Sequence, residues 1–211
     1  MRILLAGATG LVGQITLQRL LDDDRCTSLL APTRRPLDLA HPKLDNPVLD
    51  FAQLRDHANQ WRADAAICAL GTTIKLAGSR EVFHRVDHDY PLWLAQALQA
   101  NGTACFVLNS AMGADPDSRV FYSRVKGELE RDLRALRFPS LTLVRPGLIG
   151  GDRAEPRPGE RIASVVLGAL GPVLPRGWRI SPAGNVAAAM IDAALLAPPG
   201  VHVVDAAQLA G

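Results

Sequence analysis

The sequence predicts an α/β fold: a doubly wound parallel sheet with helices on both faces, built as a single domain. Short, continuously apolar runs alternate with longer segments of helical periodicity along most of the 211 residues. Strands that are buried on both faces read as unbroken apolar runs, which is the pattern of parallel sheets. A chain with 48% apolar and 21% charged residues is typical of one globular domain.

The N-terminal half supplies most of the expected sheet. We expect strands over residues 2–6, 26–31, 46–51 and 64–70. Two segments carry apolar residues at helical spacing and predict helices over residues 11–21 and 90–100.

The C-terminal half continues the alternation and then breaks it. We expect strands over residues 103–109, 140–145 and 201–204, and helices over 120–137 and 183–197. The helix over 120–137 is the clearest, because its apolar residues form one stripe. Residues 151–180 are rich in proline and glycine, and we expect a substrate or lid loop around a short helix over 162–170.

Charge and composition exclude several classes of partner. The net charge is +2 and no basic run exceeds two residues, so nucleic acid is not expected as a partner. No stretch of 18 apolar residues predicts a membrane span. The first apolar run is too short for a signal peptide, so we expect a cytoplasmic protein. Three scattered cysteines do not form a disulfide framework, and buried thiols are expected.

A glycine-rich turn, GATGLVG, follows the first strand and opens the first helix. Gly7 permits a tight turn, Gly10 lets the backbone approach a pyrophosphate, and Gly13 lets the helix pack on the strand. The N-terminus of the helix presents free N–H groups and a positive dipole end to phosphates. The strand–turn–helix context favours a dinucleotide-binding site.

The residues at the end of the second strand indicate which of two dinucleotides, NAD or NADP, is favoured. NAD sites usually place an acidic residue there, but this chain has Arg34 and Arg35. Guanidinium groups suit the 2′-phosphate of NADP, so NADPH is favoured over NADH. Asp50, at the end of the third strand, is a candidate to accept a hydrogen bond from adenine, or simply a cap. Ala69, Leu70 and Gly71 end the fourth strand, and small residues there leave room for the cofactor.

Three residues predict the chemistry. Tyr122 and Lys126 are four apart on the clearest helix and share one face, and Ser110 ends the fifth strand. A nearby ammonium favours the phenolate of a tyrosine. Tyr122 would then exchange a proton with a carbonyl oxygen, Ser110 would hydrogen-bond that oxygen, and Lys126 would also hold the nicotinamide ribose. Gly127, inside this helix, predicts close approach of a backbone or of the cofactor.

Two other groups of residues carry weaker signals. His84, Asp87 and His88 have a spacing seen in metal sites, but no third protein ligand is identifiable and no metal is expected. The loop arginines Arg153, Arg157 and Arg161 would either clamp an anionic substrate or face solvent.

These segments together resemble the atypical short-chain dehydrogenase/reductase superfamily, with its Rossmann-like NAD(P)-binding fold. Within it the chain resembles the branch of the oxidoreductase-like Tat-interacting protein. The matching segments are GATGLVG, TRRP, CALGTT, RVDHDYP, NSAMGAD, YSRVKGELE, RPG and DRAEPRPGE. The resemblance implies NADPH contacts from Gly7, Thr9, Gly10, Leu11, Val12, Arg34, Arg35, Leu70, Gly71, Thr72, Tyr122 and Lys126. It also implies that Pro146, Gly147 and Leu148 line the nicotinamide end.

Two departures from relatives limit what the resemblance implies. This chain lacks the N-terminal extension of the Tat-interacting relative, so the partner interactions of that relative are not expected. The region after residue 151 is shorter than the substrate domain of sugar epimerases, so a nucleotide-sugar substrate is not expected.

We therefore expect an NADPH-dependent oxidoreductase that acts on a small carbonyl or alcohol substrate, as a monomer or homodimer. One alternative is an NADPH-binding regulatory or scaffold protein with little turnover, since binding motifs do not prove chemistry. A second alternative is an epimerase or dehydratase that retains its cofactor.

Overall fold

A computed structural model describes residues 1–150 and 179–210 of the chain. Its main sheet has seven strands in the order β3-β2-β1-β4-β5-β6-β9, and every neighbouring pair is parallel. The strands are β1 (Arg2–Ala6), β2 (Ser28–Leu30), β3 (Leu44–Asp45), β4 (Ala65–Cys68), β5 (Cys105–Asn109), β6 (Ser140–Val144) and β9 (Gly200–Val204). This order is that of a doubly wound, Rossmann-like sheet, which confirms the predicted fold class.

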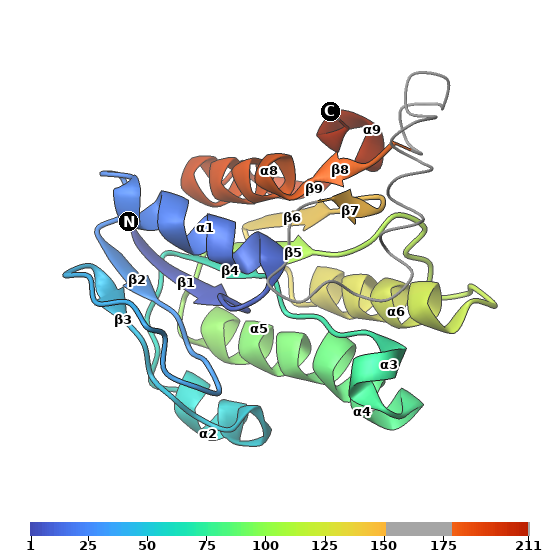
Figure 1. Ribbon diagram of the computed structural model, residues 1–211, viewed down its shortest axis with the longest axis horizontal. Coiled ribbons are helices and arrows are strands. Elements are labelled where there is room, and N and C mark those ends of the chain that lie inside the picture. The colour runs from blue at the N-terminus through green and yellow to red at the C-terminus, as the bar shows by residue number, and fades with distance from the viewer. Residues whose placement is uncertain (151–178, 211) are drawn as a thin grey trace.

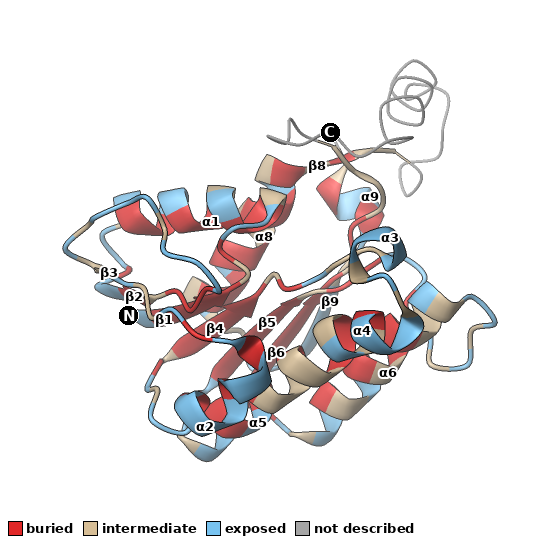
Figure 2. Cartoon of the chain, turned by 60° about the horizontal axis from the view of Figure 1, so that its bottom comes forward, coloured by how far each residue is buried: buried red, intermediate tan, exposed pale blue. Residues whose placement is uncertain are grey.

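The sheet lies between two helical layers (Figure 1). One face is covered by α1 (Leu11–Asp22) and α8 (Ala183–Leu196), and the other by α2 (Leu54–Ala58), α5 (Tyr90–Ala100) and α6 (Phe121–Ala135). In β1, the side chains of Ile3 and Leu5 pack in the core beneath α1 and α8, and those of Leu4 and Ala6 pack in the core beneath α2, α5 and α6. This alternation follows from the two-residue period of a strand, and Figure 2 shows the buried residues gathered along the strands.

The long helices were predictable from their periodicity, and the short ones were not. Helices α1, α5, α6 and α8 agree with the four long helices expected within one or two residues at each end. The predicted helix over 162–170 lies outside the described residues. The short additional elements are η1 (Phe51–Gln53), α3 (Ile74–Ala77), α4 (Arg80–His84), the π-helical turn η2 (Arg85–Asp89), β7 (Ile149–Gly150), β8 (Ser181–Pro182) and α9 (Ala206–Leu209).

The strand expected over residues 46–51 is wrong. The third strand is instead β3, which pairs with β2, and only one isolated bridge, Thr33 to Val48, follows it. Phe51 begins the 3₁₀ helix η1, because the Asp50 carboxylate accepts a hydrogen bond from the Ala52 N–H and caps that turn. Pro47 has no N–H to donate to a sheet ladder, and after the bridge at Val48 the chain turns into η1 instead of extending a strand.

The carboxyl ends of β1 and β4 define the crevice where ligands bind in such sheets. The chain leaves β1 toward α1 on one face, and it leaves β4 toward the helices on the other face. The segments after β1, β4, β5 and β6 therefore meet at one edge of the sheet. Every predicted catalytic residue lies on these segments or on α6.

Candidate functional site

Backbone packing requires two of the three glycines of the first turn. Gly7 has a φ of +90°, and a β-carbon there would lie 2.6 Å from the carbonyl carbon of Ala69. A β-carbon at Gly13 would collide with the carbonyl oxygen of Gly7. The turn is therefore pressed against the segment that follows β4, and the first turn of α1 is pressed against the glycine turn.

Gly10 is different, because within residues 1–150 and 179–210 the space beside it is open. Gly10 is exposed, its φ is −79°, and a β-carbon there would meet only the Gly7 carbonyl oxygen, at 3.5 Å. Gly10 is the N-cap of α1, and no side chain caps this helix end. The first N–H groups of α1 thus lie beside open space, which fits the phosphates of a dinucleotide.

The two arginines after β2 lie on an anchored turn. The buried Thr33 donates a hydrogen bond from its hydroxyl to the Arg35 carbonyl oxygen and accepts one from Asn46. The side chains of Arg34 and Arg35 are exposed, and no ion pair within residues 1–150 or 179–210 uses either guanidinium. Both groups are available to bind an anion.

Lys126 is held by a residue that sequence reasoning did not assign to the site. Its ammonium lies 2.8 Å from the Asp87 carboxylate, and the two side chains are only 4% and 1% exposed. Burial by itself lowers the pKa of Lys126, but Asp87 and then Tyr122 raise it, and the net pKa is raised. Asp87 also accepts a hydrogen bond from the Thr72 N–H. Asp87 thus ties η2 both to α6 and to the segment after β4.

Gly71 lies against this ion pair. A β-carbon at Gly71 would be 3.3 Å from an oxygen of Asp87 and 3.9 Å from the nitrogen of Lys126. The segment after β4 therefore passes directly over the buried ion pair, and a side chain larger than that of Gly71 would crowd the two charged groups.

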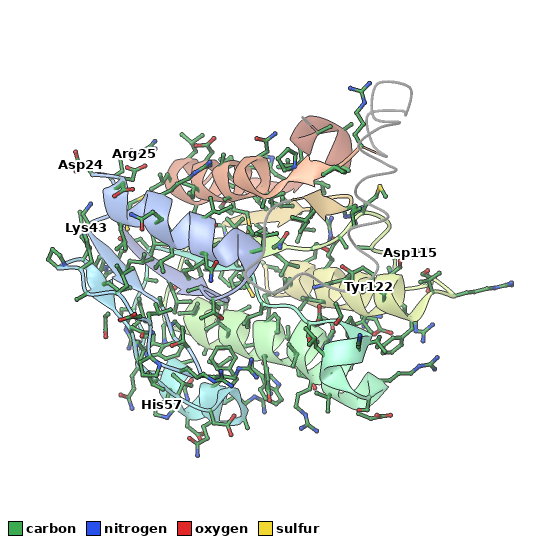
Figure 3. All side chains as sticks on the ribbon, in the orientation of Figure 1. Asp24, Arg25, Lys43, His57, Asp115 and Tyr122 are labelled. Carbon is green, nitrogen blue, oxygen red and sulfur yellow. The ribbon has the colours of Figure 1, made fainter. Side chains whose placement is uncertain are left out.

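Tyr122 lies in the first turn of α6 and is 41% exposed (Figure 3). Its ring packs at 5.9 Å from the ring of the buried Phe83 of α4. Tyr122 precedes Lys126 by one helical turn and is one of the groups that raise the pKa of Lys126.

Ser110 forms a buried network behind this face of α6. Its hydroxyl donates a hydrogen bond to Glu130, at 2.6 Å, and Glu130 also receives two hydrogen bonds from Arg145. The predicted hydrogen bond from Ser110 to a substrate oxygen would have to replace the bond to Glu130, because a hydroxyl has one hydrogen. Glu130 was not predicted, although it follows the buried Lys126 by four residues on α6 and so lies on the same buried side.

The segment after β6 is fixed by backbone contacts. The Met112 N–H donates to the Pro146 carbonyl oxygen, and the Gly147 N–H donates to the Ser181 hydroxyl. The Leu148 carbonyl oxygen accepts a hydrogen bond from the Ser181 N–H. Pro146, Gly147 and Leu148 therefore lie beside the end of β5. The resemblance implies that these three residues line the nicotinamide end of the cofactor.

The three cysteines and Gly127 lie within the described residues, and the loop arginines do not. All three cysteines are free and buried, as expected, and burial raises the pKa of Cys68 to about 11. The open question about Gly127 is answered by a backbone: a β-carbon there would collide with Asp115 and Pro116. The loop arginines Arg153, Arg157 and Arg161 and nearly all of the expected lid, residues 151–178, lie outside the described residues.

Known proteins match most of this chain. Protein HTATIP2 of Rattus norvegicus is 35% identical over 194 residues, which cover 90% of this chain and 79% of that protein. The fmp52 protein of Emericella nidulans is 36% identical over 188 residues, covering 83% and 80%. The chain belongs to the HTATIP2 and FMP52 family, an atypical branch of the short-chain dehydrogenase/reductases. No family model matches the chain.

Solved structures support the same fold at lower identity. The enzyme WbmH of Bordetella bronchiseptica, solved in complex with NAD⁺, has a TM-score of 0.72 and 14% identity. The match covers 97% of this chain and 75% of that one. At this identity the likeness shows the Rossmann-like fold.

The expectation of a cytoplasmic protein is contradicted. Several fungal members of the family, including the fmp52 protein of Emericella nidulans, are named as mitochondrial proteins. The short apolar run at the N-terminus argues only against a signal peptide, and it does not predict the compartment. Within residues 1–150 and 179–210, no helix is both long and apolar enough to cross a membrane.

Proposed function

We propose that this protein is an NADPH-dependent oxidoreductase that acts on a small carbonyl or alcohol substrate. The observation that carries the proposal is the meeting of two features at one edge of the sheet. These are the open helix end at Gly10 and the Tyr122–Lys126 face of α6. NAD⁺ in the structural neighbour WbmH gives further support for a dinucleotide.

The cofactor would be held by its phosphates and its adenosine. The first turn of α1, with Thr9, Leu11 and Val12, would hold the pyrophosphate, since helix N-termini bind anions. Arg34 and Arg35 would bind the 2′-phosphate, which favours NADPH over NADH. Asp50 would accept a hydrogen bond from adenine with the carboxylate oxygen that does not cap η1.

The nicotinamide end would lie nearer the end of β6. Leu70, Gly71 and Thr72 on one side, and Pro146, Gly147 and Leu148 on the other, would flank the nicotinamide half. Bound NADPH would supply the hydride that reduces the substrate carbonyl.

Tyr122 would supply the proton that balances the reduction. Tyr122 is 41% exposed, which would let a substrate oxygen reach its side chain. The ammonium of Lys126, fixed by Asp87, favours the phenolate that remains after the proton has moved. Ser110 would hydrogen-bond the same substrate oxygen if Glu130 released its hydroxyl. In the oxidation direction, Tyr122 would take the proton back.

The test of this proposal compares wild type with Tyr122→Phe on a panel of small aldehydes and ketones. We expect wild type to oxidise NADPH with at least one of them, and Tyr122→Phe to bind NADPH normally but turn over at least about a hundredfold more slowly. NADPH binding without turnover on the whole panel would favour the regulatory or scaffold alternative. Equal turnover by the variant would remove Tyr122 from the chemistry.

A further inference from the structure

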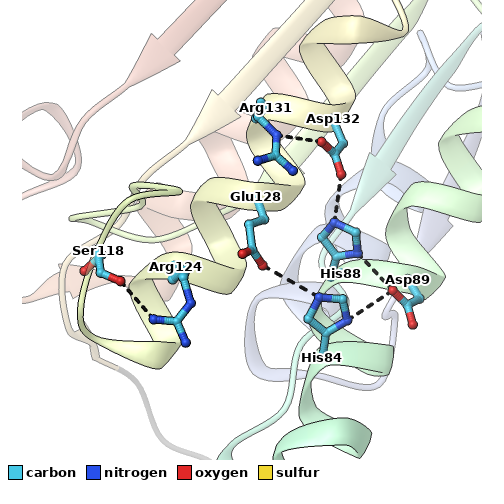
Figure 4. A network of polar contacts seen from close by, with 8 residues as sticks. All are labelled: His84, His88, Asp89, Ser118, Arg124, Glu128, Arg131 and Asp132. Carbon is cyan, nitrogen blue, oxygen red and sulfur yellow. Dashed lines mark hydrogen bonds and ion pairs between the residues drawn. The ribbon is translucent and has the colours of Figure 1, made fainter.

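A second cluster of titratable side chains lies between α4–η2 and α6 (Figure 4). His84 and His88 stack with ring centroids 4.5 Å apart. Their Nδ1 atoms lie 3.2 and 2.9 Å from the same oxygen of Asp89. Their Nε2 atoms face α6: that of His88 is 3.1 Å from Asp132, and that of His84 is 3.7 Å from Glu128.

The two imidazoles have fewer N–H donors than they have contacts with carboxylate oxygens. Each of the four ring nitrogens faces a carboxylate oxygen, but a neutral imidazole donates from only one nitrogen. With both rings neutral, two nitrogen lone pairs therefore point at carboxylate oxygens. Two additional protons or one divalent cation would remove that repulsion.

The charges also leave room for a cation. Asp89, Glu128 and Asp132 bring three negative charges, and Arg131 pairs with Asp132 at 2.9 Å. With neutral imidazoles, this set carries a net charge of about −2, which one divalent ion offsets.

We propose that His84, His88 and Asp89 form a binding site for a divalent transition-metal ion of the Zn²⁺ type. Donor atoms of the three residues all lie within 4.8 Å of one another. Zinc ligands at about 2.0–2.2 Å in a tetrahedral arrangement are about 3.3–3.6 Å apart, so each histidine nitrogen, at 3.2 or 2.9 Å from the Asp89 oxygen, would move outward by a few tenths of an ångström on binding. Sequence reasoning grouped Asp87 with the two histidines, but Asp87 pairs with Lys126, and the structure instead places Asp89 beside both rings.

The carboxylates on α6 complete the site. Histidines that bind a metal through one nitrogen usually donate the other N–H to a carboxylate, which fixes the ring. Asp132 is placed to accept from His88 in this way, and Glu128 lies 3.7 Å from the second nitrogen of His84. Two nitrogens and one oxygen suit Zn²⁺, Ni²⁺ or Cu²⁺, whereas Mg²⁺ and Ca²⁺ prefer oxygen ligands alone.

The site is accessible, and it has a structural consequence. The side chains of His84 and Asp89 are 36% and 31% exposed, which leaves a path for the ion and a position for water. The three ligands bracket Asp87, which holds Lys126. A bound ion would brace η2 against α6 and so help to fix that ion pair. This role does not depend on the oxidoreductase proposal.

The test uses the full-length chain without a histidine tag, stripped of metal with a chelator, and titrated with ZnCl₂ by calorimetry. We expect saturable binding of one ion per chain that millimolar Mg²⁺ does not displace. His84→Gln, His88→Gln and Asp89→Asn should each weaken binding at least about tenfold, and Asp132→Asn about tenfold or more. His57→Gln, an exposed histidine on α2, is the matched control and should bind as wild type does.

A measurement on wild type alone guards against variants that fold poorly. In ¹⁵N spectra of the imidazoles, Zn²⁺ should shift the resonances of two histidines and leave those of His41, His57 and His202 in place. Co²⁺ should give visible bands without the intense sulfur charge-transfer absorption that a cysteine site would produce. Absence of saturable Zn²⁺ binding, unchanged affinity in His84→Gln and His88→Gln, or a cysteine-type Co²⁺ spectrum would each overturn the proposal.

Discussion

The ammonium of Lys126 lies 2.8 Å from the carboxylate of Asp87, and both side chains are buried. The pair joins α6 to η2, and the Thr72 N–H adds the segment after β4 through its hydrogen bond to Asp87. Three segments that are distant in the sequence are therefore fixed around one positive charge. The position of Lys126 beside the segment that follows β4 depends on this pair.

Asp87→Asn should strongly destabilise the protein. The substitution leaves Lys126 buried without a charged partner, and breaking a buried pair from one side costs about 3–5 kcal/mol. Urea unfolding at pH 7 measures this loss. The double variant Asp87→Asn/Lys126→Met should recover part of it, because no buried charge remains. A single variant as stable as wild type would contradict the account.

The same pair predicts a loss of stability in alkali. The folded-state pKa of Lys126 is raised, so folding strengthens the binding of its proton. The stability that this group contributes is therefore complete below its unfolded pKa of about 10.4 and is lost as the pH rises through the folded value. Urea unfolding between pH 9 and pH 11 should show a steeper decline for wild type than for the double variant Asp87→Asn/Lys126→Met. Parallel declines would show that Lys126 does not contribute.

Gly10→Ala and Gly13→Ala should separate binding from folding. A β-carbon at Gly10 has space and a permitted φ of −79°, so the fold should be unchanged while NADPH affinity falls at least about tenfold. A β-carbon at Gly13 collides with Gly7, and such overpacking costs about 1–3 kcal/mol. Thermal unfolding and NADPH titration of both variants test this. Normal NADPH affinity in Gly10→Ala would remove the phosphates from the turn.

Ser110→Ala should lower stability through Glu130. The buried carboxylate loses the hydroxyl donor at 2.6 Å, which costs about 1–3 kcal/mol even though Arg145 still pairs with it. Ser123→Ala on α6, where the hydroxyl has no hydrogen bond within the described residues, is the matched control. The difference in the free energy of unfolding between the two variants isolates the contact with Glu130. No difference would mean that this hydrogen bond contributes nothing to stability.

Sequence patterns predicted the sheet and the long helices, because burial on both faces and helical periodicity are local properties. They failed for residues 46–51, where an apolar run ends in a cap at Asp50 that depends on the Ala52 N–H. Gly127 was recognised as unusual, but its cause, the backbone at Asp115, is a contact formed only in the folded chain.

The polar partners within the site were the least predictable part. Asp87 and Glu130 are charged residues in helical segments, where an exposed position is the ordinary expectation. Their burial follows from pairing with Lys126 and Arg145, which requires the arrangement of three strands and two helices. The ends of the parallel strands could be aligned from the sequence, and these side-chain pairs could not.

The most direct test of the central claim is a titration of the purified protein with NADPH and with NADH, in which calorimetry or fluorescence measures the binding. Binding through the Gly10 turn and the arginine pair predicts that NADPH binds at least about tenfold more tightly than NADH, a difference of about 1.4 kcal/mol. Arg34→Ala/Arg35→Ala should abolish that preference and leave the weaker NADH affinity unchanged. Equal affinities in wild type would remove Arg34 and Arg35 from the site, and absence of binding by both dinucleotides would contradict the proposed function.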